Sequence, residues 1–187
     1  MKDKKTMILG ARTWAARRIL HEAKKRGHHA GIFDPAYLVT VITSHLSDML
    51  YLNKSNKDKP KRIYKNSLSS IIPRIGRGLK YHSKAVEHIN KNLQIPSTAT
   101  GEGLLNAHDK IKTIQLLSQA KIRVPKTIPF KKANNIKWHI DQLGGFPVVA
   151  KVIHGSKGVG VFILNDPLSA STGLEAFTAN GHTLLLQ

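Results

Sequence analysis

The feature that most constrains the fold is a lysine within an apolar strand that runs directly into a glycine-rich loop. Lys151 lies in the predicted strand Val148–Ile153, where a bare ammonium group is costly unless an anion meets it. Three glycines follow within the six residues Gly155–Gly160, and a second apolar strand is predicted over Val161–Leu164. Because glycines let backbone amides approach a phosphate closely, this strand–loop–strand hairpin can fold over a nucleotide as a lid.

The glycine loop alone leaves two interpretations open. It contains neither a GxxxxGK[ST] motif nor a GxGxxG motif that opens a helix, so a flexible β-hairpin without a ligand fits the same residues. A second lysine favours the phosphate interpretation. Lys110 falls in the first turn of a helix predicted over Asp109–Gln119, with Asp109 as its N-cap or a residue of its first turn. A cation at this positive end of the helix dipole is disfavoured unless it serves an anion.

The beginning of the chain alternates strand, helix and strand, which predicts the β-α-β opening of a doubly wound parallel sheet. The three elements are Thr6–Leu9, Trp14–Arg26 and Ala30–Phe33. Trp14, Ile19 and Ala23 are predicted to share the apolar face of the helix. The fold class that follows is α/β.

Further elements are predicted along the rest of the chain from short apolar runs and helical periodicity. They are a strand at Ser70–Gly76, a helix at about Tyr81–Asn90, a short strand at Leu93–Ile95, an extended segment at Thr127–Phe130, a helix at Ile136–Leu143 and a strand at Thr183–Leu186. Residues 36–52 fit either a strand or a short helix. The part after residue 125 reads as β-hairpins around one helix, and we expect two domains, 1–100 and 101–187.

The charge is strongly positive and unevenly distributed. Lys and Arg number 30 against 11 Asp and Glu, a net charge of +19 over 187 residues. Residues 1–95 hold 20 of these cations and 6 acids, so 20 − 6 = +14, and residues 96–187 hold 10 and 5, so 10 − 5 = +5. Such a surplus favours a polyanionic neighbour: nucleic acid, a ribosomal surface, nucleotide phosphates or an acidic peptide. A merely solubilising surface is the alternative.

The most basic segment, Lys54–Lys65, has two interpretations, a nucleic-acid clamp or a solvated loop. Aromatic residues make up only 6% of the chain and are scattered. Because single-stranded nucleic acid is usually held on aromatic stacking platforms, a nucleic-acid module is possible but not favoured.

The composition excludes several classes of protein. No cysteine is present, which excludes a disulfide scaffold, cysteine-ligated zinc, an iron–sulfur cluster and thiol catalysis. No apolar run approaches the length of a membrane span, and the start of the chain is too polar for a signal peptide, so we expect a cytoplasmic protein without a membrane partner. His28 and His29 are adjacent and His82 and His88 lie six apart, spacings that do not suit a zinc site.

Five linked motifs resemble those of a known superfamily. They are IPRIG at Ile72–Gly76, DKxxTxxLL at Asp109–Leu117, VPxT at Val124–Thr127, GGFPVVAK at Gly144–Lys151 and GSKGVGV at Gly155–Val161. In this order and spacing they resemble the ATP-grasp superfamily, and most closely its RimK-like members, which attach glutamate to a carboxylate. The resemblance extends over roughly residues 6–187.

The resemblance implies a fold and an activity. It implies an N-terminal doubly wound pre-ATP-grasp domain followed by the central ATP-grasp lid subdomain, here incomplete at its C-terminal end. The activity implied is an ATP-dependent carboxylate–amine ligation through an acyl phosphate, with ATP and Mg²⁺ as cofactors. The implied partners are glutamate or another amino acid and a carboxylate acceptor, for which the tail of a ribosomal protein is one candidate.

The resemblance also assigns roles to individual residues. Lys110 and Lys151 match the two lysines that meet the ATP phosphates. The lid and the strand after it supply the remaining nucleotide contacts: Gly155, Ser156, Gly158, Val159, Gly160 and Gln187. Arg74 is a candidate contact for a substrate carboxylate or an acyl phosphate, with a structural salt bridge as the alternative. No other catalytic residue is assigned.

The family pattern continues beyond the last residue of this sequence. The acidic residue that holds the ribose and the ligands of Mg²⁺ would follow Gln187, so we expect no metal ligands within the chain and no activity from the isolated 187 residues. Three explanations are open: a fragment of a longer ligase, one half of a split enzyme that needs a partner or an oligomer, or a degenerate protein with a binding role. The terminal run LLLQ is expected to leave an apolar strand edge exposed.

Overall fold

The computed structural model describes residues 5–42, 44, 47–52, 59–64, 66–153 and 159–187. The chain divides into two compact units, Met1–Leu105 and Asn106–Gln187. Each unit has its own sheets, two in the first and one in the second among the described residues, and its own apolar core.

The first unit contains two sheets and their covering helices. Its elements are β1 (Lys5–Gly10), α1 (Trp14–Lys25), β2 (Ala30–Phe33), the 3-10 turn η1 (Pro35–Tyr37), β3 (Leu38–Ile42), β4 (Ser47–Tyr51), β5 (Lys61–Ile63), β6 (Leu68–Arg74) and α2 (Leu79–Lys91). Helix α3 (Gly101–His108) runs across the division between the units.

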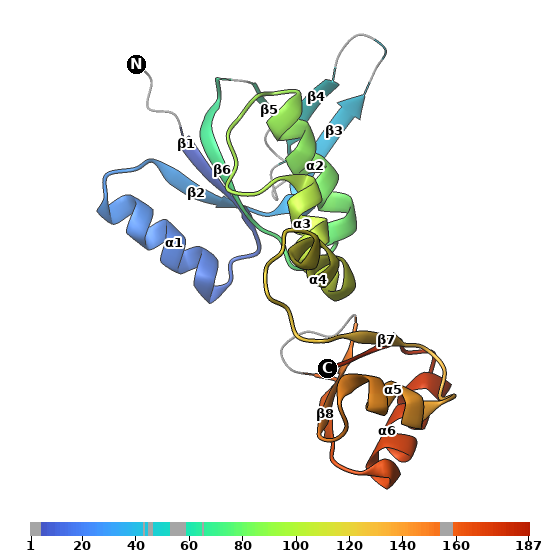
Figure 1. Cartoon of the computed structure of the whole chain (residues 1–187). Coiled ribbons are helices and arrows are strands. Elements are labelled where there is room, and N and C mark those ends of the chain that lie inside the picture. Colours follow the sequence, from blue (N-terminus) through green and yellow to red (C-terminus); the bar gives the residue numbers. More distant parts are fainter. Residues whose placement is uncertain (1–4, 43, 45–46, 53–58, 65, 154–158) are drawn as a thin grey trace. The chain divides into compact units, whose positions relative to one another are not determined.

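The centre of the first unit is a parallel sheet in the order β2-β1-β6. Successive side chains of a strand point to opposite faces. Met7 and Leu9 lie on one face, in the same core as Val86 and Ile89 of α2, whereas Ile8 is fully buried on the other face. In Figure 1, α1 and α2 flank this sheet. Burial on both faces explains the short continuous apolar run of β1, and the doubly wound fold is confirmed.

The segment 36–52, which the sequence left open between strand and helix, is a 3-10 turn followed by two strands. Strands β3, β4 and β5 form a separate antiparallel sheet in that order. Leu38, Met49 and Ile63 bury one face of it against the core of the first unit. Of the basic segment Lys54–Lys65, residues 54–58 and 65 lie outside the described residues, so the predicted clamp is not described as a whole.

The predicted strand at Leu93–Ile95 is wrong. The backbone amide of Leu93 donates to His88 O at 3.3 Å and that of Ile95 to Ile89 O at 3.1 Å, so both amides close the end of α2. They therefore cannot join a strand ladder. Pairing with β6 occurs two residues later, as an isolated parallel bridge between Ser97 and Ile71.

The apolar face predicted for the first helix is also wrong at Trp14, which is 81% exposed. Ala16 is the buried residue of α1, and Ile19 and Ala23 are half-buried beside it. A helix turns about 100° per residue, so Trp14 lies roughly 200° from Ala16 and points away from the core.

The second unit is an antiparallel sheet with α5 and α6 packed on one face. Its elements are α4 (Lys110–Gln119), β7 (Ile128–Phe130), α5 (Ile136–Leu143), β8 (Val148–Val152), β9 (Val161–Leu164), α6 (Pro167–Ala179) and β10 (Leu184–Leu186). The strand order is β7-β10-β8-β9. One sheet face joins Ile140 of α5 and Leu174 of α6 in a single core, and both helices lie beside β8 in Figure 1.

The prediction of one helix among hairpins after residue 125 missed α6. Asp166 caps this helix by accepting from Ser169 N at 2.8 Å, and Ser169 Oγ in turn lies 3.1 Å from Asp166 N. Pro167 occupies the first turn, where its missing N–H costs nothing. Asp, Pro and Ser at these spacings are a helix-start signal that could have predicted α6 from the sequence.

The expected exposed edge at the end of the chain is wrong as well. Strand β10 lies inside the sheet, because it pairs with β7 on one side and β8 on the other. All three of its leucines are buried. Strand β10 is thus paired on both sides and buried, which explains why the terminal run is apolar.

Candidate functional site

The candidate site lies on the face of the second sheet opposite helices α5 and α6, here called the open face. Ala150 belongs to the core face of β8, so the neighbouring Lys151 points to the opposite, open face. Residues directly opposite one another in antiparallel strands share a face. Lys151 is opposite Val161 on β9 and Leu185 on β10, which places all three side chains in one row, in which Leu185 is buried and Val161 is exposed.

A second row of the open face lies one pair further along the sheet. Val149 is opposite Ile163, and its backbone exchanges two hydrogen bonds with Gln187, of 2.7 and 3.0 Å. Ile163 is 59% exposed and Val161 47% exposed, although both are large apolar residues within a strand. The open face therefore combines one ammonium group with an apolar surface.

Lys151 is held by a short chain of polar side chains. Its Nζ donates to Gln187 Oε1 at 2.6 Å, and Gln187 Nε2 donates to Thr127 Oγ1 at 2.8 Å. Thr127 Oγ1 in turn donates to Pro125 O at 2.8 Å. Because the Thr127 hydroxyl proton is already directed to Pro125, the hydroxyl accepts from the amide of Gln187 and turns the amide oxygen toward Lys151.

Lys110 begins α4, as predicted. Asp109 is the N-cap, and one of its carboxylate oxygens accepts from the amides of Ile111 at 2.9 Å and Lys112 at 3.0 Å. The ammonium group of Lys110 donates to Ile153 O at 2.6 Å and to Val152 O at 3.2 Å. Carbonyl oxygens thus face the cation at this helix start, and Lys110 lies where β8 ends and the glycine loop begins.

The glycine loop is described only at its end. Gly155, Ser156 and Gly158 lie outside the described residues, whereas Val159 and Gly160 lie within them. Gly160 has φ +75°, and a Cβ atom there would lie 2.7 Å from Val152 Cγ2. The carbonyl of Gly160 accepts from Val152 N at 2.8 Å, so the site where the hairpin closes requires glycine.

Arg74 lies in the first unit, whereas Lys110 and Lys151 belong to the second. It ends β6 beside Gly10, which ends β1, and its side chain is exposed. In open α/β sheets, ligands bind outside the carboxyl ends of the strands where the strand order reverses. Strands β1 and β6 meet at such a reversal, since β2 and β6 lie on opposite sides of β1.

Metal ligands are not gathered in the described part of the chain, where no group of three or more His, Asp or Glu side chains could hold an ion. Asp109 and Asp166 cap helices, and Asp141 pairs with Lys137 at 2.6 Å. These carboxylates do not fit a Mg²⁺ site.

Sequence reasoning missed the apolar part of the site and the role of Thr127. Both Val149 and Ile163 alternate with core residues of their strands, and this period of two could have assigned them to the open face. The hydroxyl of Thr127 meets Gln187 across 60 residues of sequence, and no local pattern predicts such a contact.

An antiparallel sheet with helices on one face and a lysine on the other, in which glycine closes the hairpin of β8 and β9, is part of an ATP-grasp fold. Residues 107–187 match the family model of the RimK-like ATP-grasp domain. This segment of the chain is therefore similar to RimK-like ATP-grasp domains, and the resemblance stated from the motifs is confirmed.

Curated relatives and solved structures agree with this family. The chain is 26% identical over 176 residues to a probable alpha-L-glutamate ligase of Rhodopirellula baltica, which covers 94% of this chain and 41% of the relative. It is 29% identical over 178 residues to a protein of the same name from Teredinibacter turnerae, covering 95% of this chain and 56% of the relative. The chain thus spans about half the length of these relatives.

Among solved structures, the RimK domain ATP-grasp protein of Sphaerobacter thermophilus has the same fold. It superposes with a TM-score of 0.64 at 19% identity, over 98% of this chain and 62% of the other. Within the described ranges, no helix is long and apolar enough to cross a membrane.

Proposed function

We propose that this chain carries the ATP-phosphate-binding part of an ATP-dependent carboxylate–amine ligase that uses glutamate. The observation that carries the proposal is Lys151 on the open sheet face, bonded to the neutral Gln187 and flanked by exposed apolar side chains. The names of the curated relatives, probable alpha-L-glutamate ligases, support the choice of reaction.

The open face offers separate surfaces for the two ends of a nucleotide. An adenine ring is flat and largely apolar, and it would lie against Val161 and Ile163, which are otherwise exposed to water. The phosphates would meet Lys151 and the loop that Lys110 supports from the end of β8. Gly155, Ser156, Gly158, Val159 and Gly160 are the residues proposed to cover them.

The reaction proposed is the formation of an amide-type bond. A carboxylate attacks the terminal phosphate of ATP to give an acyl phosphate and ADP, and the amine of glutamate then displaces phosphate. The contribution of this chain is fixed positive charge where negative charge develops during phosphoryl transfer. Mg²⁺ remains part of the proposal for the whole enzyme, and we assign it no ligand among the described residues.

The first unit, proposed as the pre-ATP-grasp domain, would hold the substrate carboxylate. Arg74 at the carboxyl edge of the parallel sheet is the residue proposed for this contact, because a guanidinium group binds a carboxylate through two parallel hydrogen bonds. We place the domain boundary near residue 100, close to the division of the chain after Leu105.

The experiment is a calorimetric titration of the chain and its variants with ATP. Lys151→Met keeps most of the side-chain volume and removes the charge, so ATP affinity should fall about 10- to 100-fold, the value of one or two charged hydrogen bonds. Lys137→Met is the matched control, because Lys137 lies in the same unit and bonds to Asp141 away from the open face. Equal affinities for the two variants would disprove the assignment of Lys151.

A further inference from the structure

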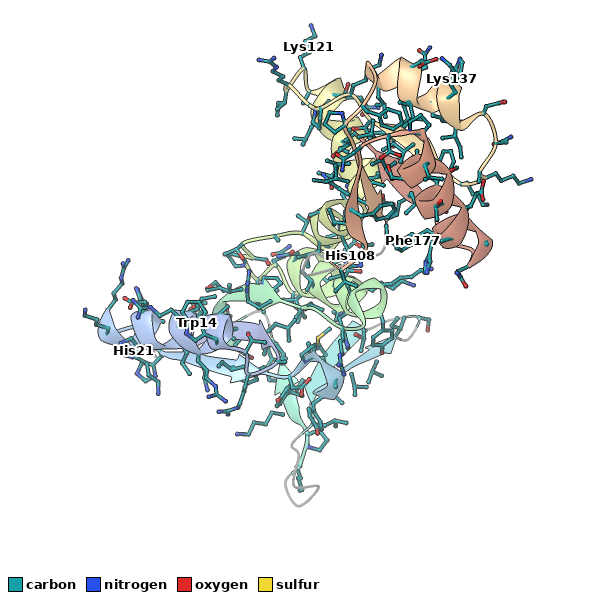
Figure 2. The ribbon with its side chains drawn as sticks, turned by 90° about the horizontal axis from the view of Figure 1, so that it is seen from below. Trp14, His21, His108, Lys121, Lys137 and Phe177 are labelled. Atoms are coloured by element: carbon teal, nitrogen blue, oxygen red, sulfur yellow. The ribbon has the colours of Figure 1, made fainter. Side chains whose placement is uncertain are left out.

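Helix α1 presents a basic face that ends in an exposed tryptophan. Trp14, Arg18, His21 and Lys25 are spaced four, three and four residues apart, so they lie on one side of the helix, and all four are exposed. Figure 2 labels Trp14 and His21 on this helix. The buried Ala16 lies on the opposite side. We call these four residues, with the flanking Arg17, the outer face of α1.

The charge of this face is not compensated from within the helix. The outer face holds Arg17, Arg18 and Lys25 against Glu22, the single acid among residues 14–26, so its net charge is 3 − 1 = +2. Glu22 pairs with Arg18 at 3.0 Å. The surplus therefore remains available to an external anion.

The cations of α1 differ in whether the helix dipole stabilises them. Lys24 and Lys25 lie in the last turn, where positive charge stabilises a helix. Arg17 and Arg18 lie beyond the first turn, where positive charge gains nothing from the helix dipole. The helix dipole therefore does not account for these two arginines, of which Arg18 pairs with Glu22.

Trp14 is likewise not explained by packing. It is 81% exposed, and among the described residues it takes part in no aromatic pair or cation–π contact. An exposed indole ring beside cations can stack on a nucleobase while the cations meet the adjoining phosphates. A duplex hides its base faces, and an acidic peptide offers no base to stack.

We propose that the outer face of α1 binds single-stranded nucleic acid, with one base stacked on Trp14 and phosphates bound by Arg17, Arg18 and Lys25. This binding surface belongs to the first unit and uses none of the residues assigned to ATP. The sequence disfavoured nucleic acid because aromatic residues are few and scattered. In the structure, however, an aromatic residue does lie beside cations on α1. Trp14, which was expected in the core, is exposed at the N-terminal end of the outer face.

The test is a fluorescence titration with a 12-nucleotide oligothymidylate. The chain has two tryptophans, so Trp138→Phe leaves Trp14 as the only indole. We expect the oligonucleotide to quench Trp14 fluorescence, with an affinity that falls steeply as salt rises. In a fluorescence-anisotropy assay with labelled oligonucleotide, Trp14→Ala should lose about tenfold in affinity, and Trp14→Phe should lose less because it keeps a ring.

Matched variants separate this surface from general charge effects. The double variant Arg17→Glu and Arg18→Glu should abolish binding, whereas Lys80→Glu with Lys84→Glu, the same charge change on exposed residues of α2, should retain most of it. Lys151→Met should bind the oligonucleotide normally, so failure of the ATP proposal would leave this result unaffected. Because Trp14 and both arginines are exposed, circular dichroism should show that all variants fold.

Several results would overturn the proposal. One is equal affinity of Trp14→Ala and the unchanged protein for oligothymidylate. Another is binding of a blunt 12-base-pair duplex or of polyglutamate at least as tight as that of oligothymidylate, which would make the outer face a site for duplex or acidic peptide instead. Absence of any quenching of Trp14 would equally exclude base stacking.

Discussion

Lys151 and Gln187 are joined by a hydrogen bond of 2.6 Å between Nζ and Oε1, although 36 residues separate them in the chain. The partner is an amide and not a carboxylate, so the bond fixes the ammonium group without neutralising it. A carboxylate in the same place would complete an ion pair and weaken the attraction for a phosphate. Gln187 thus holds the positively charged ammonium group of Lys151 in a fixed position on the open face of the sheet.

The first prediction concerns this neutral partner. Gln187→Glu should lower ATP affinity about tenfold, since the new carboxylate would pair with Lys151 and repel the phosphates. Thr127→Val removes the hydroxyl that orients the amide of Gln187 but adds no charge, so its effect should be smaller. Calorimetric titration with ATP measures both. Unchanged affinity in Gln187→Glu would mean that phosphates do not approach this pair.

The sequence predicts best where a few adjacent residues determine the outcome. Asp109 as N-cap, Lys110 in the first turn and Lys151 within a strand before glycines were all identified from short patterns. The position of β10 in the middle of the sheet was not, because it depends on pairing with β7 and β8, which are distant in sequence. From the sequence alone, the terminal LLLQ resembles an edge strand, because no local pattern identifies the strands with which it pairs.

The same distinction holds for the first helix. The predicted bounds Trp14–Arg26 agree closely with the helix, which Thr13 caps at its start and Gly27, with φ +76°, follows at its end. The predicted apolar face was wrong at Trp14. Its hydrophobic side chain suggested burial, whereas its angle of about 200° from the buried Ala16 places the ring in solvent.

The second prediction concerns the cap that positions Lys110. Asp109→Ala removes the carboxylate that accepts from two amides of α4, so the unfolding free energy should fall by about 1 kcal/mol. Asp109→Ser should recover most of this loss, because a hydroxyl can cap the same amides. Urea denaturation followed by circular dichroism compares the three proteins. If serine proved no better than alanine, side-chain capping would not be the cause.

The third prediction tests the enclosed position of β10. Leu184→Ala should destabilise the second unit by about 2–5 kcal/mol, since Leu184 is fully buried between two neighbouring strands. Leu168→Ala is the matched control: Leu168 is 75% exposed on α6 and should change stability by less than about 0.5 kcal/mol. Fluorescence of Trp138, in a Trp14→Phe background, reports unfolding of this unit. Similar effects of the two substitutions would place β10 at an exposed edge after all.

The fourth prediction concerns the close approach of β1 and β6 at the edge of the parallel sheet that carries Arg74. A Cβ atom on Gly10 would clash with the carbonyl oxygen of Arg74 and lie 3.1 Å from its Cβ, and backbone atoms within a sheet cannot move aside easily. Gly10→Ala should therefore cost about 1–3 kcal/mol of unfolding free energy, as overpacking does. Gly76→Ala is the control, because a Cβ atom there would meet nothing within 4 Å and its stability should stay within about 0.5 kcal/mol of the unchanged protein. Urea denaturation followed by circular dichroism measures both, and equal stability of the two variants would show that the strands do not approach so closely at Gly10.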